Sequence, residues 1–164
     1  MKIVGVTGTP GTGKTTLSKM LAKATGLSYI DVTEIIKDKG IDEGFDNKRK
    51  CLIVDTDRLF SEIKSHIKKI KGKGVIIDSH LSHYLPADFL QILIITTCDI
   101  GMLKERLKER GYDESKIREN LDAEIFSLCS NEALEYKHNR IEVNTSNGVS
   151  KQKVEEIADA IKKL

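Results

Sequence analysis

A short run of glycines, threonines and one lysine near the start of the chain has the spacing of a phosphate-binding loop. The pattern G-x-x-x-x-G-K-[ST] is matched by Gly8, Gly13, Lys14 and Thr15. Glycines let the backbone curl so that its N–H groups point inward at an anion, the lysine reaches the β- and γ-phosphates, and the hydroxyl suits Mg²⁺. A glycine-rich turn without a ligand is the alternative, but chance produces this pattern in only about one such chain in two hundred. We therefore expect nucleotide phosphates and Mg²⁺ to bind here.

A second candidate is Asp78, the last residue of the apolar run GVIID. Proteins with a phosphate-binding loop complete their metal site with an acid at the end of a neighbouring strand, directly or through a water. An aspartate in this position is also an ordinary helix cap. The loop at Lys14 and Thr15 favours the metal role, so we predict that Thr15 and Asp78 share the Mg²⁺.

Two histidines, His80 and His83, follow Asp78. An imidazole at position 80 is near enough to the metal acid to act beside the γ-phosphate, where an ordinary pKa near neutrality would suit proton transfer. A plain surface histidine is an equally good interpretation of His80, and it is the one we expect for His83. A zinc site is disfavoured because the pair lacks a third ligand at matching spacing.

The charged segment after residue 100 carries Arg106, Arg110 and Arg118. Guanidinium groups are planar and permanently charged, so they suit phosphate oxygens and stack on bases. A helix followed by a flap could place these groups over a nucleotide, whereas the alternative is a solvated helix surface with Glu–Lys pairs. The phosphate role fits Arg110 best and Arg118 least.

The segments that must position these residues alternate between strand and helix patterns. Short apolar runs predict strands over 2–6, 27–30, 74–78, 90–96 and 140–143, and residues with helical spacing lie near 17–26, 59–70, 117–128 and 154–164. This alternation predicts a parallel sheet with helices on both faces and ligands beyond the carboxyl ends of the strands. We expect one three-layer α/β/α domain over residues 1–164, with a five-stranded, mostly parallel sheet.

Two polar stretches do not fit a packed layer. They are residues 40–50, with two glycines, and the charged residues 109–119. In an enzyme that must exclude water, such stretches are the places to expect moving flaps.

Composition excludes several functions. The formal net charge is only +2, and no apolar run reaches the roughly 18 residues of a membrane span, so we expect no membrane contact and only local contact with RNA. The lysines of segment 64–73 form either such an RNA patch or the solvated face of a helix. Cys51, Cys98 and Cys129 are scattered without a C-x-x-C pair, as in a reducing compartment. A cytoplasmic protein is expected.

Together these motifs resemble the nucleoside monophosphate kinases that carry a P-loop. The resemblance is closest to the adenylate kinase isoenzyme 6 type, also described as the coilin-interacting nuclear ATPase family, in an archaeal or eukaryotic-like form. It runs across nearly the whole chain. Its specific parts are GTPGTGKTT at 8–16, DTDRL at 55–59, the Asp78-x-His80 pair, ERGY at 109–112 and ENLDAEIF at 119–126.

The resemblance implies an activity and a set of residues. It implies transfer of the γ-phosphate of Mg-ATP to AMP or similar monophosphates, with a lid at about 109–119 and a monophosphate-binding region at about 31–54. The residues implied for ATP are Gly11, Gly13, Lys14, Thr15, Thr16 and Arg110, and Lys14, Asp78 and His80 are the catalytic candidates.

The resemblance also implies ATP hydrolysis and maturation of the small ribosomal subunit through a ribosomal protein partner. An assembly factor whose ATP cycle drives remodelling, with secondary kinase activity, is therefore an alternative function. A small kinase acting on a non-nucleotide is a third. For a eukaryotic member the location would include the nucleus.

One departure from the family concerns the acceptor phosphate. Adenylate kinases usually grip this phosphate with an arginine on the helix after the second strand, and here that segment, DVTEIIKDKG, offers only Lys37. Lysine is a point charge and not a bidentate fork. Arg58 could share the task, so Lys37 and Arg58 are the expected acceptor-binding residues.

Overall fold

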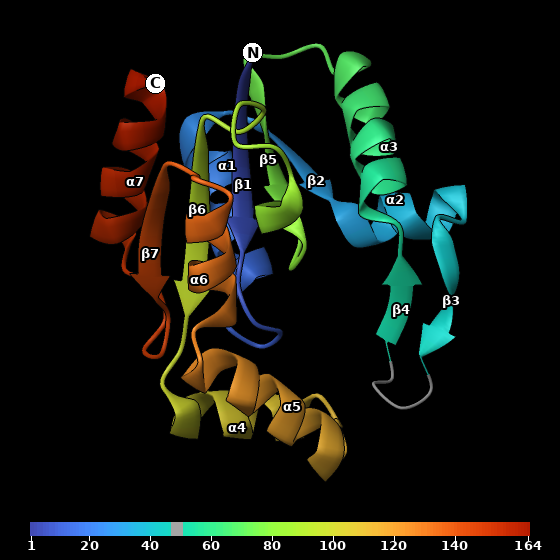
Figure 1. Ribbon diagram of the computed structural model, residues 1–164. Coiled ribbons are helices and arrows are strands. Elements are labelled where there is room, and N and C mark those ends of the chain that lie inside the picture. The colour runs from blue at the N-terminus through green and yellow to red at the C-terminus, as the bar shows by residue number, and fades with distance from the viewer. Residues whose placement is uncertain (47–50) are drawn as a thin grey trace.

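Five parallel strands form the centre of the molecule. The computed structural model describes residues 1–46 and 51–164 and is drawn in Figure 1. The sheet has the order β2-β5-β1-β6-β7, and all of its pairings are parallel. The strands are β1 (Lys2–Thr7), β2 (Ser28–Asp31), β5 (Gly74–Asp78), β6 (Ile92–Thr97) and β7 (Arg140–Asn144). The prediction of a five-stranded parallel sheet is confirmed.

Helices cover both faces of this sheet, so the expected three-layer fold is confirmed. Figure 1 shows α1 behind the strands and α6 in front of them, with α4 and α5 beyond the carboxyl ends of β1 and β6. The helices are α1 (Lys14–Thr25), α2 (Val32–Lys39), α3 (Thr56–Lys68), the 3₁₀ turn η1 (Ser82–Tyr84), α4 (Ile100–Glu109), α5 (Glu114–Ile125), α6 (Leu128–Glu135) and α7 (Lys151–Lys163).

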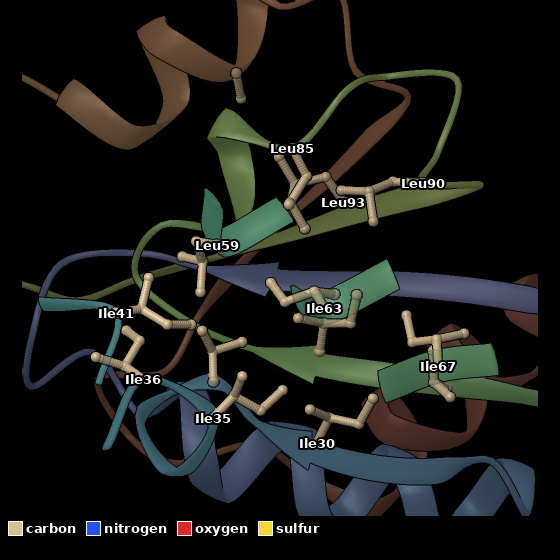
Figure 2. Close-up of a cluster of buried hydrophobic side chains, with 14 of the residues drawn as sticks. Ile30, Ile35, Ile36, Ile41, Leu59, Ile63, Ile67, Leu85, Leu90 and Leu93 are labelled. Atoms are coloured by element: carbon tan, nitrogen blue, oxygen red, sulfur yellow. The ribbon is translucent and has the colours of Figure 1, made fainter. Parts of the chain in front are cut away.

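Consecutive residues of the central strands face opposite helix layers. Ile76 and Ile94 pack in a cluster with side chains of α1 and α7. Ile77 and Ile95 pack in the other cluster, which Figure 2 shows with the isoleucines of α2 and α3. Because both faces of the strands are buried, their sequences read as continuous apolar runs and not as alternating ones.

Local signals set several helix boundaries. Gly26 ends α1 with φ 71° and donates its N–H to Ala22 O at 2.9 Å, as its position in the sequence predicts. Asp55 is the N-cap of α3, and its Oδ1 accepts hydrogen bonds from the N–H groups of Asp57 at 2.9 Å and Arg58 at 3.1 Å.

The polar stretch 40–50 is not wholly irregular. Residues 47–50 lie outside the described part of the chain, but β3 (Asp42–Asp46) pairs in antiparallel fashion with β4 (Cys51–Val54). The prediction missed β3 because Gly44 and the acidic residues around it disfavour a strand locally. Pairing with β4, which local sequence does not reveal, stabilises the strand instead.

The helix expected over 117–128 is wrong at its C-terminal end. The structure ends α5 at Ile125 and starts α6 at Leu128, with Ser127 between them at φ 49°. Ile125 and Leu128 are 55% and 45% exposed, so they do not continue the buried face begun by Ile117. Apolar spacing alone does not distinguish one helix from two short ones that meet at a break.

The charged flap expected at 109–119 is mostly helical. Only residues 110–113 connect α4 to α5, and Asp113 Oδ1 accepts the N–H of Lys116 at 2.9 Å as the N-cap of α5. Within the described residues, no helix combines the length and hydrophobicity needed to cross a membrane.

Candidate active site

The phosphate-binding loop lies between β1 and α1, and two of its glycines occupy positions that other residues disfavour. Gly8 has φ 141°, and a Cβ there would lie 2.4 Å from the carbonyl oxygen of Thr96. Gly13 has φ 86° and is the last residue before α1. These two positions explain why the motif needs glycine at both ends of its curl.

Hydrogen bonds hold the loop to two neighbouring segments. The Thr12 side chain donates to Thr9 O at 2.7 Å and lies 2.6 Å from the hydroxyl of Thr96 on β6. After β7, the Thr145 hydroxyl donates to Thr12 O at 2.6 Å. The loop is therefore positioned before any ligand binds, which lowers the entropic cost of holding a phosphate.

The first turn of α1 faces the same space as the loop. Among the described residues, no side chain caps this helix, and its first turn contains no acidic residue. The positive end of the helix dipole and its backbone N–H groups are thus available to an anion. Thr15 and Thr16, both exposed, add hydroxyl groups at this end.

Lys14 lies across the loop. Its Nζ donates hydrogen bonds to Gly8 O at 2.8 Å and Thr9 O at 3.0 Å. Desolvation lowers the pKa of Lys14 to about 8, although the negative charge of Asp78 opposes this shift. The side chain is therefore mostly charged at pH 7 but close to losing its proton.

A cavity of about 340 Å³ brings the loop together with residues far away in the sequence. It opens at the carboxyl ends of the strands, where ligands bind in this class of fold. The lining residues that the sequence predicted are Gly11, Gly13, Lys14, Thr15, Thr16, His80 and Arg110. Those that it did not predict include Thr33, Tyr112 and Lys116.

Asp78 ends β5, beside β1, and is 4% exposed. Its Oδ2 accepts a hydrogen bond from the Tyr29 hydroxyl at 2.9 Å. Burial and this carboxylate raise the pKa of Tyr29, so the phenol stays protonated and keeps donating. The hydrogen bond fixes the orientation of a carboxylate that interacts electrostatically with Lys14.

Asp78 and Thr15 are hard oxygen donors of the kind that Mg²⁺ takes, and of the two only Thr15 is among the residues that line the 340 Å³ cavity. The described residues contain no group of three or more His, Cys, Asp or Glu arranged to hold a metal. Mg²⁺ in nucleotide sites does not require such a group, because phosphates and waters supply most of its ligands.

His80 is exposed and faces the cavity. The pKa of His80 lies below its ordinary 6.5, because the surrounding protein desolvates the ring and positive Lys14 repels its charged form. The expectation of a pKa near neutrality is thus wrong for this structure, in which His80 is neutral at physiological pH.

His83 is not the surface histidine that the sequence suggested. It is 2% exposed, with Nδ1 2.8 Å from the Thr7 hydroxyl and Nε2 2.9 Å from Glu132 Oε2. The turn η1, which directly follows the Asp78 segment, folds His83 inward against β1 and α6. Its polar partners come from distant segments, so spacing could not reveal the burial.

The three arginines have different environments. Arg106 donates from Nη2 to Thr145 O at 2.7 Å and to Ser146 O at 2.9 Å, which ties α4 to the segment after β7. Arg110 is exposed at the rim of the cavity. The Arg118 side chain is 85% exposed, 3.9 Å from Asp122, so the solvated interpretation holds for Arg118.

A second cavity, of about 380 Å³, adjoins the loop. It shares Gly11, Gly13, Thr16 and Arg110 with the first cavity and extends to residues at and beyond the end of β7. The additional lining residues are Arg106, Glu109, Thr145, Gly148 and Val149. An apolar Val149 and flat guanidinium groups beside the phosphate loop can accommodate a planar base.

The expected acceptor residues lie apart from this site. Lys37 on α2 and Arg58 on α3 are exposed, and neither is among the residues that line the 340 Å³ cavity. Thr33, in the first turn of α2, lines it instead. Lys116 also lines the cavity, and the sequence contained a signal for it. It is a cation within the stretch 109–119, which was predicted to be a flap over the nucleotide.

The chain matches a protein-family model described as "AAA domain" over residues 4–127. It is 41% identical over 161 residues to a protein of Thermococcus kodakarensis, covering 98% of this chain and 86% of the relative. A protein of Pyrococcus furiosus is 40% identical over 159 residues, covering 97% and 83%. Both relatives carry the description "Putative adenylate kinase".

Solved structures match the fold at low sequence identity. A shikimate kinase from Acinetobacter baumannii superposes with a TM-score of 0.62 at 17% identity, covering 99% of this chain and 92% of that one. The protein TT1252 from Thermus thermophilus gives a TM-score of 0.61 at 15% identity, covering 99% and 96%. At these identities the similarity concerns the fold alone.

Proposed function

Because the chain belongs to the family of adenylate kinase-like P-loop kinases, we propose that it transfers the γ-phosphate of Mg-ATP to AMP or another nucleoside monophosphate. Within the family, we propose membership of the isoenzyme 6 type. The observation that supports the reaction best is the 340 Å³ cavity, which is lined by the phosphate loop, His80 and Arg110 together. A phosphoryl group held by the loop would face a space large enough for an acceptor.

On the donor side, the loop N–H groups and Lys14 bind the β- and γ-phosphates. The second cavity, beside Val149, takes the adenine. Thr15 and Asp78 would hold Mg²⁺, which when bound would neutralise charge on the phosphates. Arg110 lines both cavities and so can contact the phosphates between them. Catalysis of this kind consists of positioning and charge neutralisation.

On the acceptor side, we propose that the monophosphate binds toward the region of about 31–54, where Thr33 lines the cavity. Lys37 and Arg58 lie outside that cavity and would serve only after this region moves toward the loop. The segment of about 109–119, which carries Tyr112 and Lys116, would act as the lid. Residues 1–164 would work as one kinase domain.

We also propose a hydrolytic side reaction. The connection between α4 and α5 is only residues 110–113, and His80 remains exposed in the cavity, so water has access to the γ-phosphate. A neutral imidazole can orient either a water or an acceptor by hydrogen bonding. Hydrolysis of ATP without acceptor would then be slower than transfer but dependent on the same residues.

A second candidate function, an ATP-driven assembly factor, is favoured by the exposed side chains of one segment. Four apolar side chains of segment 119–135 are exposed, and the segment contains several acidic residues but no lysine or arginine. A basic protein such as the ribosomal partner implied by the resemblance would complement it, in the cytoplasm or nucleus. The exposed side chains are Ile125 (55%), Phe126 (64%), Leu128 (45%) and Leu134 (50%).

Incubation of the protein with Mg-ATP and a panel of nucleoside monophosphates tests these functions. Diphosphate formation with one monophosphate, at a rate above hydrolysis without acceptor, is the expected result. Hydrolysis that only a basic protein partner accelerates would favour the assembly factor. Inertness toward every monophosphate would overturn the kinase proposal.

A further inference from the structure

The carboxylate of Glu124 joins three segments that the proposed reaction depends on. Its Oε2 accepts a hydrogen bond from the Thr9 hydroxyl in the phosphate loop at 2.6 Å. Its Oε1 accepts the backbone N–H of Cys98, just after β6, at 2.8 Å. Glu124 itself belongs to the last turn of α5. One side chain thus connects the loop, the sheet and the helix that follows Arg110.

Thr9 is a central residue of the loop. Its carbonyl oxygen accepts hydrogen bonds from the N–H and hydroxyl of Thr12, at 3.2 and 2.7 Å, and from Lys14 Nζ at 3.0 Å. The Thr9 side chain is 2% exposed and points to Glu124. A change in the position of Thr9 would therefore move both the curl of the loop and the ammonium group that contacts phosphate.

The other end of α5 faces the cavity. Lys116, near the N-terminus of the helix, lines it, and Glu124 lies eight residues later. A helix rises about 1.5 Å per residue, so these two side chains leave the helix about 12 Å apart. The helix is anchored to the loop at one end and lines the nucleotide cavity at the other.

We propose that Glu124 is a positioning residue, which fixes the phosphate loop through Thr9 and anchors the helix of the lid to it. This inference rests on the proposed binding of Mg-ATP to the loop. Glu124 touches no reacting atom, and its contact with the phosphate loop is the hydrogen bond from Thr9. Its carboxylate is half-buried, so the hydrogen bond from Thr9 is charge-assisted and weakly screened by solvent. The negative charge also favours the protonated form of Lys14.

The test measures equilibrium binding of Mg-ATP and steady-state kinetics for Thr9→Val, Glu124→Gln and the double variant. Valine keeps the shape of threonine without its hydroxyl, and glutamine keeps the oxygen that accepts from Cys98. Each single change should weaken Mg-ATP binding about tenfold, as expected for one lost charge-assisted bond. The affinity of the double variant for Mg-ATP should be no more than about threefold below that of the single variant that binds more weakly. The reason is that both changes remove the same charge-assisted bond.

Two further variants distinguish a role of Glu124 in positioning the phosphate loop from a role in the stability of the whole fold. Thr9→Ser keeps the hydroxyl, so its affinity for Mg-ATP should lie within about twofold of the wild-type affinity. Glu135→Gln changes an exposed glutamate on α6 and should alter nothing. The KM for ATP should rise in Thr9→Val while kcat falls less, whereas a merely structural role would lower the melting temperature and leave KM unchanged.

Wild-type protein that fails to bind Mg-ATP would overturn the proposed function itself. Wild-type binding combined with unchanged affinity in Thr9→Val would overturn only the role of Glu124. Additive losses in the double variant would do the same, since they would mean that the two residues act separately. If Thr9→Val fails to fold, the affinities of Glu124→Gln and Thr9→Ser for Mg-ATP still decide the question. Glu124→Gln should bind about tenfold more weakly than the wild type, and equal affinities of these two variants would overturn the role of Glu124.

Discussion

Tyr29 on β2 donates a hydrogen bond from its hydroxyl to Oδ2 of Asp78 on the adjacent strand β5, at 2.9 Å. The sequence places these residues 49 positions apart, and only the pairing of the two strands brings them together. The phenol thus selects one orientation of the carboxylate proposed to hold Mg²⁺. This relationship makes Tyr29 a determinant of the proposed metal site although it lies outside every motif.

Replacement of Tyr29 by phenylalanine should raise the Mg²⁺ concentration needed for half-maximal turnover by about three- to tenfold, the worth of one such hydrogen bond. The aromatic ring remains, so the fold should persist. Titration of Mg²⁺ at fixed ATP measures the effect. Tyr84→Phe is the matched control, because the Tyr84 hydroxyl donates to Glu132, at 3.1 Å, outside the cavity. An unchanged Mg²⁺ profile in Tyr29→Phe would contradict the prediction.

The pKa of Lys14, lowered to about 8 by burial, predicts a pH dependence. The ammonium form attracts phosphate, so ATP capture should be nearly complete at pH values at least about one unit below 8 and should weaken as pH rises through 8. Because kcat/KM reports the free enzyme, it should fall on the alkaline side. A bound phosphate would raise the pKa of Lys14 by its negative charge, so kcat should fall at a higher pH than kcat/KM does.

A variant of the same residue checks the origin of this alkaline limb. Arginine stays protonated throughout this range, so in Lys14→Arg the fall of kcat/KM near pH 8 should disappear, whatever the remaining rate. Lys14→Ala should lose turnover by at least about a hundredfold while remaining folded, because a contact strengthened in the transition state is lost. An alkaline limb that persists in Lys14→Arg would assign it to another group.

Arg110 and Arg118 provide a matched pair on the segment proposed as the lid. Arg110 lines both cavities, whereas the Arg118 side chain is 85% exposed outside them. Arg110→Ala should raise the KM for ATP about tenfold and lower kcat, since it removes a phosphate contact. Arg118→Ala should leave both constants within about twofold. Equal effects of the two substitutions would argue against a specific contact by Arg110.

Substitution of His80 should lower the reaction rates, whereas substitution of His83 should lower the stability of the fold. His80→Ala should lower both transfer to AMP and ATP hydrolysis by about ten- to a thousandfold, with unchanged ATP affinity and melting temperature. His83→Ala removes a buried ring that contacts Thr7 and Glu132, so it should cost about 2–3 kcal/mol of stability. Single-turnover rates and chemical denaturation separate the two. Intact rates in His80→Ala would reduce this residue to a surface histidine.

Much of the fold could be predicted because its signals are local. The apolar runs at 74–78 and 90–96 appear as β5 and β6, and the end of α1 falls at Gly26. The order of the strands in the sheet and the pairing of β3 with β4 are non-local. The break at Ser127 also escaped prediction, because helical periodicity continues on both sides of it.

The candidate site divides in the same way. The sequence alone determined the phosphate loop, since Gly8 to Thr16 are contiguous and their backbone conformation follows from residue type. Tertiary structure decided the rest. It placed Thr33, Lys116 and Glu124 around the loop, buried His83 and left Lys37 and Arg58 outside the cavity. The physical reason is that contacts between segments depend on how helices pack across the sheet, and residue spacing along one segment carries no information about that packing.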